Sequence, residues 1–181
     1  MSFMNYSTLS KIYDSGAMAE NAGRLKNYDV FHCLLAGGPD RAAAVTKRVS
    51  GLPKDFLQWL EVCDGGMLFD TTMLCTKTHD ATLDLDFETY SNYLDAELRK
   101  SKGISDNWFI FASAIHGDVF YFDLEKNDGH VYQWDIEERK VYTSWHNFHD
   151  WLTGIIDEAV ALIADEELEP LDIKLEVDDN G

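Results

Sequence analysis

The segment 51–69, with the sequence GLPKDFLQWLEVCDGGMLF, constrains the fold most, because it contains a complete predicted helix and the start of a strand. Pro53 suits the first turn of a helix, where its missing N–H would have no partner anyway. Gly65-Gly66 suits a left-handed stop after the last turn. We therefore predict a helix over 53–63, in which apolar residues recur at the spacing of one buried face. The apolar run 67–69 then predicts a buried strand.

The second half of the chain carries the clearest strand signals. The nearly continuous apolar run 108–112 predicts a central strand that is covered on both faces. The runs 119–123 and 130–134 flank Asp128-Gly129, a pair that can supply the positive φ that a hairpin requires, and a further run follows at 140–143. Together these segments predict a β-meander.

Three further helices are predicted from apolar periodicity. One spans 41–49 with Asp40 as its cap, and another covers about 86–103. The last, 148–163, has the most regular apolar stripe in the sequence and should lie against the sheet, with Ser144 as a candidate cap. The predicted core contains Leu52, Phe56, Leu60, Phe69, Trp108, Phe122, Trp151 and Ile155.

Several of these features form a combination that is typical of one known family. A Leu-Pro pair opens a short helix with an apolar and aromatic face, and a Gly-Gly pair precedes a bulky apolar strand. A strand that begins with tryptophan, a Gly-Asp turn and a closing aromatic helix face follow in order. The residues that carry these features are Leu52, Pro53, Phe56, Gly65, Gly66, Trp108, Gly117, Asp118, Phe148 and Trp151. On these residues, the chain over about 42–163 resembles the SUKH superfamily, named after a fungal cell-wall assembly regulator and its many bacterial relatives.

The length and the patterns predict a single α+β domain in which a mostly antiparallel β-meander sheet packs against helices. We expect the SUKH-like domain to cover 41–165, after an N-terminal helical extension over 1–40 and before an acidic C-terminal tail over 166–181. Apolar and charged residues alternate strictly over 171–178, which is the period of a half-buried strand. The tail is therefore predicted to be either an edge strand of the protein's own sheet or a strand offered to a partner.

The charge balance is strongly acidic, with 33 Asp and Glu against 15 Lys and Arg and a net charge of −18. Such a surface repels nucleic acid and anionic membranes, so we expect neither as a partner. The chain has no apolar stretch of membrane-spanning length and no secretory signal pattern, so a cytoplasmic location is expected. Its three cysteines are unclustered and lie in apolar surroundings, which favours reduced core thiols over disulfides or zinc.

The sequence offers weak candidates for catalysis. His146 and His149 are three residues apart and could share a metal only if a third ligand came from elsewhere. His116 precedes Gly117-Asp118, where a strand turn is expected. Phosphate-loop, nucleophile-elbow and reactive-cysteine motifs do not occur. We therefore predict that the protein is not an enzyme and needs no cofactor or metal; the weakest alternative is a small metal-dependent hydrolase built on these three histidines.

The family resemblance implies a binding module. Bacterial members of the superfamily are largely immunity proteins that bind and neutralise toxins, many of them nucleases, whereas eukaryotic members are regulatory or scaffold components. An acidic surface suits the first role, because a nuclease cleft that holds phosphate presents positive charge. We therefore expect an immunity protein that binds a basic toxin domain, with a regulatory interaction protein as the alternative. The predicted contacts are carboxylates at strand ends and turns: Asp64, Asp70, Asp118, Asp123, Glu125 and Asp128.

Overall fold

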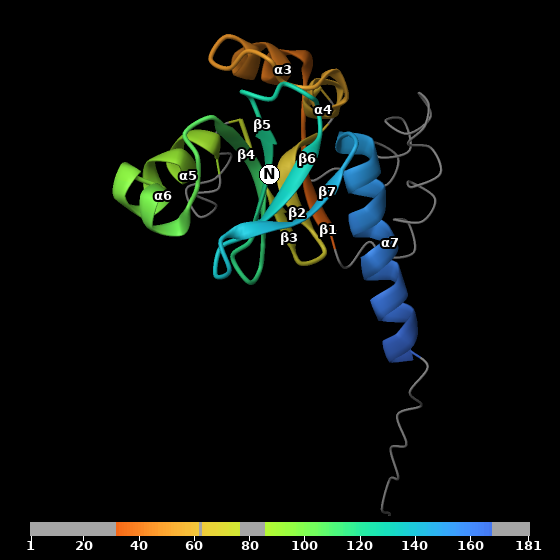
Figure 1. The fold of residues 1–181 in the computed structure, drawn as a ribbon. Helices are drawn as coiled ribbons and strands as arrows, with labels where there is room; N and C mark the ends of the chain where they lie inside the picture. The colour runs from red at the N-terminus through yellow and green to blue at the C-terminus, as the bar shows by residue number, and fades with distance from the viewer. Residues whose placement is uncertain (1–31, 62, 77–85, 168–181) are drawn as a thin grey trace, which may run out of the picture.

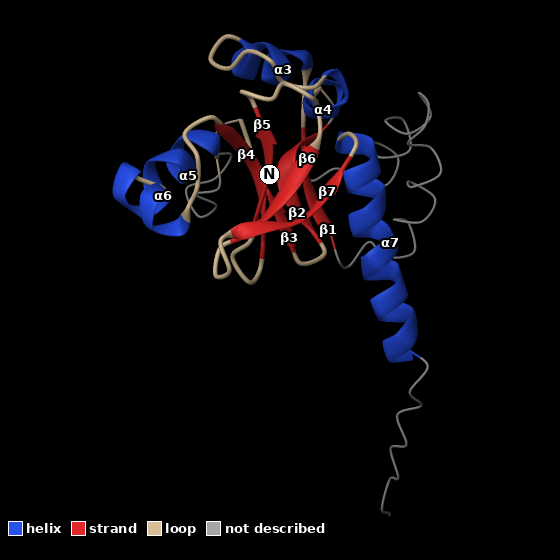
Figure 2. Cartoon of the chain, in the orientation of Figure 1, coloured by secondary structure: helices blue, strands red, loops and turns tan. Residues whose placement is uncertain are grey.

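The computed structural model describes residues 32–61, 63–76 and 86–167. Within these residues, strands β1 to β7 form one sheet in which each strand pairs antiparallel with its sequence neighbour. The strands are β1 (His32–Ala36), β2 (Cys63–Leu68), β3 (Thr71–Met73), β4 (Trp108–Ala114), β5 (Val119–Asp123), β6 (Val131–Asp135) and β7 (Lys140–Trp145). Figure 2 shows this sheet at the centre of the molecule. The chain therefore folds as the antiparallel meander that its sequence predicts.

The helices cover the sheet from two sides and from one end. They are α3 (Pro39–Thr46), α4 (Lys54–Leu60), α5 (Phe87–Tyr93), α6 (Ala96–Lys102) and α7 (Phe148–Glu167). Figure 1 shows α5 and α6 on one side of the sheet, α7 on the opposite side, and α3 and α4 near one end. This arrangement is the predicted single α+β domain. None of the described helices combines the length and apolar character needed to span a bilayer.

Strand β4 lies in the middle of the sheet and is covered on both faces, as its apolar run predicts. Phe111 and Ala112 belong to the cluster of buried residues under α4 and α7, which we call the main core. Ile110 belongs to the cluster under α5 and α6, which we call the second core. The register with β5 shifts between Ile110 and Ala112, so two successive side chains enter the main core.

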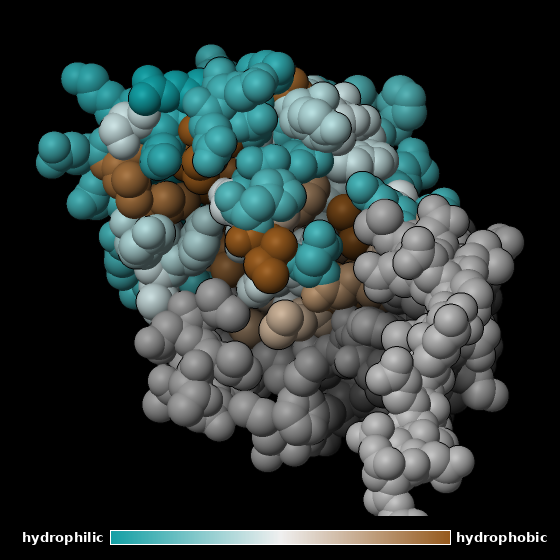
Figure 3. Space-filling model, turned by 90° about the horizontal axis from the view of Figure 1, so that it is seen from below, coloured by the Kyte–Doolittle hydropathy of each residue, from teal (hydrophilic) through white to brown (hydrophobic). Residues whose placement is uncertain are grey.

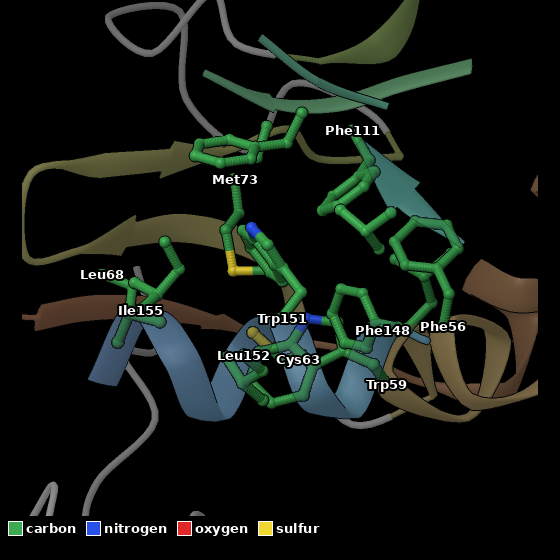
Figure 4. Packing of buried hydrophobic residues seen from close by; sticks show 14 of the residues in the cluster. Phe56, Trp59, Cys63, Leu68, Met73, Phe111, Phe148, Trp151, Leu152 and Ile155 are labelled. Atoms are coloured by element: carbon green, nitrogen blue, oxygen red, sulfur yellow. The ribbon is translucent and has the colours of Figure 1, made fainter. Parts of the chain in front are cut away.

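The main core packs α4 and α7 against the sheet, largely through aromatic rings (Figure 4). The ring centroid of Phe56 lies 5.1 Å from that of Phe122, 5.4 Å from that of Phe111 and 5.3 Å from that of Phe148. Trp151 packs edge-on against Phe111 with a centroid distance of 4.9 Å. Because such tilted and edge-on pairs add to the free energy gained from burial, these rings hold the two helices to the sheet.

Most of the predicted core residues lie in the main core. The buried ones are Phe56, Leu60, Phe122, Trp151 and Ile155. Leu52 and Phe69 are partly buried against it. The prediction for Trp108 is wrong, because this residue packs on the second core and stacks on Tyr121 with ring centroids 3.9 Å apart. Where the pairing is regular, successive side chains of a strand point to opposite faces, so Trp108 packs on the second core and its neighbour Phe109 on the main core.

The helix stop predicted at Gly65-Gly66 is also wrong. Helix α4 ends at Leu60, and both glycines lie inside strand β2. Their φ values of 80° and 120° are positive, which glycine adopts readily. A Cβ atom on Gly65 would stand 2.7 Å from the carbonyl oxygen of Met73 and 2.8 Å from that of Leu74. Glycine is therefore needed here because neighbouring backbone approaches β2 closely.

The single helix predicted over 86–103 is two helices. Helix α5 follows Asp86, whose side chain accepts hydrogen bonds from two backbone N–H groups of the first turn. Helix α6 follows Asp95, which caps it in the same way with one hydrogen bond. Leu94 leaves the helical conformation between them and is buried in the second core. The apolar pattern looks continuous because both helices pack on this core.

Residues 32–36, which were predicted to belong to a helical extension over 1–40, form the strand β1 instead. This strand pairs with β2, with a register shift between Leu34 and Ala36. Its partner is about thirty residues away in the sequence, so local patterns alone could not reveal it. The rest of the extension and residues 168–181 of the tail lie outside the described residues.

Helix α3 begins two residues earlier than predicted. Its N-cap is Gly38, and Pro39 occupies the first turn, where its missing N–H is tolerated. Asp40 therefore lies inside the first turn and is not the cap. Its negative charge is still favourable near the helix N-terminus.

Two of the three cysteines occupy the core positions that were predicted for them. Cys63 and Cys75 are buried. Burial, reinforced by the carboxylates of Asp64 and Asp86, raises the pKa of Cys75 to about 12. This thiol therefore stays protonated at neutral pH, and a protonated thiol is a poor nucleophile.

The N-terminus of α7 is capped by residues that the sequence did not single out. Ser144, the predicted cap, lies inside β7. Instead, the Asn147 side-chain oxygen accepts a hydrogen bond from the backbone N–H of Asp150 at 2.8 Å. The Asp55 carboxylate accepts one from the backbone N–H of His149 at 3.2 Å. Because Asp55 belongs to α4, this hydrogen bond joins the two helices of the main core.

Replacing Asp55 with alanine should therefore lower the free energy of unfolding by about 0.5–2 kcal/mol, as the loss of a helix cap does in other proteins. Urea denaturation followed by circular dichroism measures the change. Glu158→Ala, an exposed change on α7, the helix whose N-terminus Asp55 caps, should stay within about 0.5 kcal/mol of the wild type. Equal losses in the two variants would show that Asp55 does not act as a cap.

Candidate functional site

The six carboxylates predicted to contact a partner do not form one surface. One lies inside the fold, two lie at the end of the sheet that carries the β4–β5 turn, and three lie at the opposite end, in the β5–β6 turn. In that order they are Asp64, then Asp70 and Asp118, then Asp123, Glu125 and Asp128. Only some of them can therefore meet a partner directly.

Asp64 is fully buried, so its assignment as an exposed contact is wrong. Its carboxylate accepts hydrogen bonds from the backbone N–H of Thr76 at 2.7 Å and from the Thr76 hydroxyl at 2.9 Å. The guanidinium Nε of Arg41 lies 3.4 Å away. A buried carboxylate with these partners connects β2, the segment after β3, and α3, so its role is structural.

Asp118 is also buried, which again contradicts the predicted exposure. It accepts hydrogen bonds from the Gln133 side chain at 3.0 Å and from the backbone N–H of Ile136 at 3.4 Å. These bonds join the β4–β5 turn to strand β6 and the β6–β7 turn. Asp70 is exposed at the same end, and its carbonyl oxygen accepts a hydrogen bond from the N–H of Ile115.

The remaining three candidates lie in the β5–β6 turn, which covers residues 124–130, or directly before it. Asp123, at the end of β5, accepts hydrogen bonds from the backbone N–H groups of Glu125 and Lys126 at 3.1 and 3.2 Å. The Glu125 carboxylate is exposed and accepts one from the Asn107 side chain at 3.0 Å. Gly129 has a φ of 74°, as the predicted Asp-Gly hairpin requires. The turn therefore presents its carboxylates on a firmly held backbone.

A cationic side chain of the protein itself lies among these carboxylates. The Lys126 ammonium stands 4.1 Å from the centre of the Tyr132 ring and 3.6 Å from the Asp123 carboxylate. The Tyr132 hydroxyl donates a 2.7 Å hydrogen bond to Asp128. We call the group formed by Asp123, Asp128 and Tyr132 the cation cage. A cation above an aromatic face and beside carboxylates is attracted by both.

The pKa directions of these groups match this arrangement. Burial alone would raise the pKa of Asp128, but hydrogen bonds from Tyr132 and from the backbone of His130 outweigh it and lower the pKa. Burial, together with the hydrogen bond to Asp128, raises the pKa of Tyr132. Burial opposes the charge of Lys126, yet Tyr132 and the nearby carboxylates raise its pKa overall. At neutral pH the cage is therefore anionic and the lysine within it is cationic.

A groove of about 620 Å³ lies beside the β5–β6 turn. It runs between the start of α4, this turn and the junction of β7 with α7. Its lining residues are Gly51, Leu52, Pro53, Lys54, Asp55, Gln58, Asn127, Asp128, Gly129, His146 and Asn147. Three segments that are distant in the sequence therefore meet beside the cation cage, and Asp128 belongs to both.

The histidines considered for a metal site do not converge. His146 packs edge-on against His130, with ring centroids 5.3 Å apart. His149 lies in the first turn of α7. His116 is at the opposite end of the sheet, 3.2 Å from Asp118. Within the described part of the chain, no group of three His, Cys, Asp or Glu side chains is placed to hold a metal ion. The geometry therefore gives no support to the hydrolase alternative built on these residues.

The sequence did not single out Lys126, Tyr132 or His130 as members of this site. The turn signal Asp128-Gly129 was visible, but the contacts across it depend on how β5 and β6 pair. Tyr132 lies opposite Tyr121 in that pairing. Tyr132 follows His130 by two residues, and side chains two apart along an extended chain lie on the same face. This alternation was the signal in the sequence that could have placed the two residues together.

Chemically, the arrangement favours recognition of positive charge. The exposed carboxylates and the aromatic face of Tyr132 can accept ammonium or guanidinium groups from another molecule. The chain is therefore an α+β protein with exposed carboxylates at the β5–β6 end of its sheet.

The family follows from comparison with known proteins. The model of the SMI1 / KNR4 family (SUKH-1) matches residues 43–154, which is more than half of the chain. The chain therefore belongs to the SMI1 / KNR4 family, as the sequence resemblance indicates. Neither the curated proteins nor the solved structures gave a match.

The structure places the residues of the family resemblance mostly in the packing of the fold. Leu52, Pro53 and Phe56 lie at the start of α4, Gly65 and Gly66 in β2, Trp108 at the start of β4, Gly117 and Asp118 in the β4–β5 turn, and Phe148 and Trp151 in α7. Phe56, Phe148 and Trp151 are fully buried in the main core. These positions therefore serve mainly the packing of the fold, and Leu52 and Pro53 also line the groove.

Proposed function

We propose that this chain is a non-enzymatic protein-binding module that acts in the cytoplasm as an immunity protein and neutralises a basic nuclease toxin. Membership of the family supports a protein-interaction role. The net charge of −18 supports a basic partner, because a nuclease cleft built for phosphate is positively charged. The observation that carries the proposal is the exposed group of carboxylates held by the β5–β6 turn.

The proposed contact surface consists of this turn and the adjoining groove. Glu125 is exposed, and Asp128 lines both the turn and the groove. Both belong to a hairpin whose strands are paired along their length. A rigid surface loses little conformational entropy on binding, so its carboxylates can match fixed positive charges on a folded partner.

A regulatory or scaffold module without a toxin partner is the second candidate. It is favoured by Ile115, whose side chain is 83% exposed in the β4–β5 turn, at the opposite end of the sheet. Figure 3 views this end and shows hydrophobic residues in small, separate groups among hydrophilic ones. A neutral partner that covers Ile115 would need neither the β5–β6 turn nor a basic cleft.

Charge reversal tests the toxin proposal against this alternative. Glu125→Lys should weaken binding to the cognate nuclease domain, which is to be sought in the reading frames next to the gene of this protein, by several-fold or more, mainly by slowing association. Glu158→Lys makes the same charge change on the exposed face of α7 and should have a smaller effect. Surface plasmon resonance at low and high salt measures both rates, and rising salt should slow association far more than it speeds dissociation. Equal effects of the two reversals would contradict the proposed contact surface.

A further inference from the structure

The residues of the cation cage are held by several contacts, whereas the side chain of the lysine is half exposed. Tyr132 stacks on Tyr121 with ring centroids 5.4 Å apart, and Tyr121 stacks on Trp108 at 3.9 Å. This row of rings anchors the face of Tyr132 to the sheet. Asp123 and Asp128 are fixed by hydrogen bonds within the turn and to Tyr132. The Lys126 side chain, in contrast, is 51% exposed and extends from the turn itself.

We propose that Lys126 is an internal placeholder and that an arginine or lysine of the protein partner replaces it in the cation cage. The geometry points to this because the cage already holds an ammonium group over the aromatic face of Tyr132 and beside the Asp123 carboxylate, while Asp128 accepts a hydrogen bond from the same tyrosine. A half-exposed lysine can swing into solvent at small cost, since surface ion pairs contribute little. The incoming cation would meet groups that are already oriented. This inference rests on the proposed function, because it assumes a basic partner.

The placeholder has a physical role in the unbound protein. Asp123 and Asp128 bring two negative charges to the surroundings of Tyr132, and Lys126 offsets part of this charge. The geometry is matched by the pKa directions. Burial opposes both charges, but the hydrogen bond from Tyr132 is the main cause that lowers the pKa of Asp128, to which Lys126 adds a smaller share, and Tyr132 with the two carboxylates raises the pKa of Lys126. Exchange of one cation for another keeps this balance, so a partner can bind without leaving the carboxylates unpaired.

The same contacts could instead serve only to stabilise the turn. The two roles predict different effects of Lys126→Ala on the affinity for a basic partner. If Lys126 is a placeholder, Lys126→Ala empties the cage and should tighten binding of a basic partner. If Lys126 only holds the turn, the substitution should destabilise the turn and weaken binding or leave it unchanged. Most alanine substitutions at a binding surface weaken the complex, so tighter binding is a distinctive result.

The matched control is Lys140→Ala. Lys140 is 59% exposed and pairs with Glu138 at the opposite end of the sheet. Its removal changes the net charge by the same amount, but it does not touch the cage. With the nuclease domain encoded beside the gene as the probe, Lys126→Ala should tighten binding about two- to five-fold more than Lys140→Ala does. An equal change in both variants would mean that only the net charge matters and would overturn the placeholder role.

A second experiment needs no toxin. The full chain is titrated with Nα-acetyl-arginine methylamide, and backbone amide shifts of residues 128 and 132 are followed by NMR. Lys126→Ala should bind this probe about two- to five-fold more tightly than the wild type. Adding Tyr132→Leu to that variant should abolish the gain, whereas Tyr132→Phe, which keeps the ring, should retain most of it. Equal binding by the wild type and Lys126→Ala, or no effect of Tyr132→Leu, would overturn the cage.

The two experiments separate this inference from the proposed function. Probe binding at the cage without association with the toxin domain would contradict the immunity role and leave the cation cage standing. Association with the toxin domain, combined with a Lys126→Ala effect no larger than that of Lys140→Ala, would contradict the cage and leave the immunity role standing.

Discussion

Phe56→Ala is expected to lower the free energy of unfolding by about 3–5 kcal/mol, the usual cost of removing a buried aromatic ring. Phe56 is 1% exposed, and its ring contacts those of Phe109, Phe111, Phe122 and Phe148. Its loss leaves a cavity between α4, the sheet and the start of α7, which the surrounding rings can fill only in part.

Equilibrium denaturation in urea measures this loss. Tyr93→Ala is the control, because Tyr93 is 69% exposed on α5 and its removal should change stability by no more than about 0.5 kcal/mol. A loss for Phe56→Ala that is as small as that for Tyr93→Ala would show that α4 does not pack against the sheet as described.

Gly65→Ala is the second large effect that we expect, with a loss of about 2–5 kcal/mol. Two costs add at this position. The φ of 80° is unfavourable for a residue with a Cβ atom, and that atom would lie 2.7 Å from the Met73 carbonyl oxygen. Because the obstacle is backbone of the adjoining strand, relief requires β2 and β3 to move apart.

Gly129→Ala separates these two costs. Gly129 has a similar φ of 74°, but a Cβ atom there would meet nothing within 4 Å. Its replacement should therefore cost only the backbone strain, about 1–2 kcal/mol. Thermal or urea unfolding of both variants gives the difference, which we attribute to the close approach of the strands. If Gly129→Ala destabilised the protein as much as Gly65→Ala, that explanation would fail.

Gly65 also shows how far the sequence alone could reach. The Gly-Gly pair correctly indicated positive φ, but a stop after a helix was predicted where the structure has a strand. The Gly-Gly pair shows that the backbone needs glycine at this point. The reason for that need is the close approach of β3, which pairs with β2 through a tight turn. The break between α5 and α6 at Leu94 was not predicted, for a related reason. The apolar period continues across these two helices because they share one core.

The apolar runs were the most reliable signals. Strand β5 coincides with its predicted run, and the apolar residues from Phe148 to Ile156 that predicted the last helix are buried in the main core. These predictions held because burial on one or both faces leaves a direct mark on local sequence. Strand β1 was not predicted from the local sequence, because its place in the sheet depends on its pairing with β2.

Only part of the candidate site could be predicted from the sequence. Carboxylates in turns were expected to be exposed, and Glu125 and Asp128 are. Asp64 and Asp118 are buried, because each accepts hydrogen bonds from residues at least twelve positions away. A sequence shows that a residue is charged but does not show whether distant N–H groups will converge on it. The contact of Lys126 with Tyr132 depends in the same way on the β5–β6 pairing.

The central claim, that this family member neutralises a basic nuclease toxin, is tested most directly by co-expression with the nuclease domain encoded beside its gene. Cell survival and recovery of a stable complex are the two readouts. We predict that the wild-type chain protects the cells and co-purifies with the nuclease, and that Glu125→Lys protects less well than Glu158→Lys. If the neighbouring genes encode no such toxin, or if the two proteins neither associate nor protect, the immunity proposal is contradicted and the regulatory binding module becomes the better account.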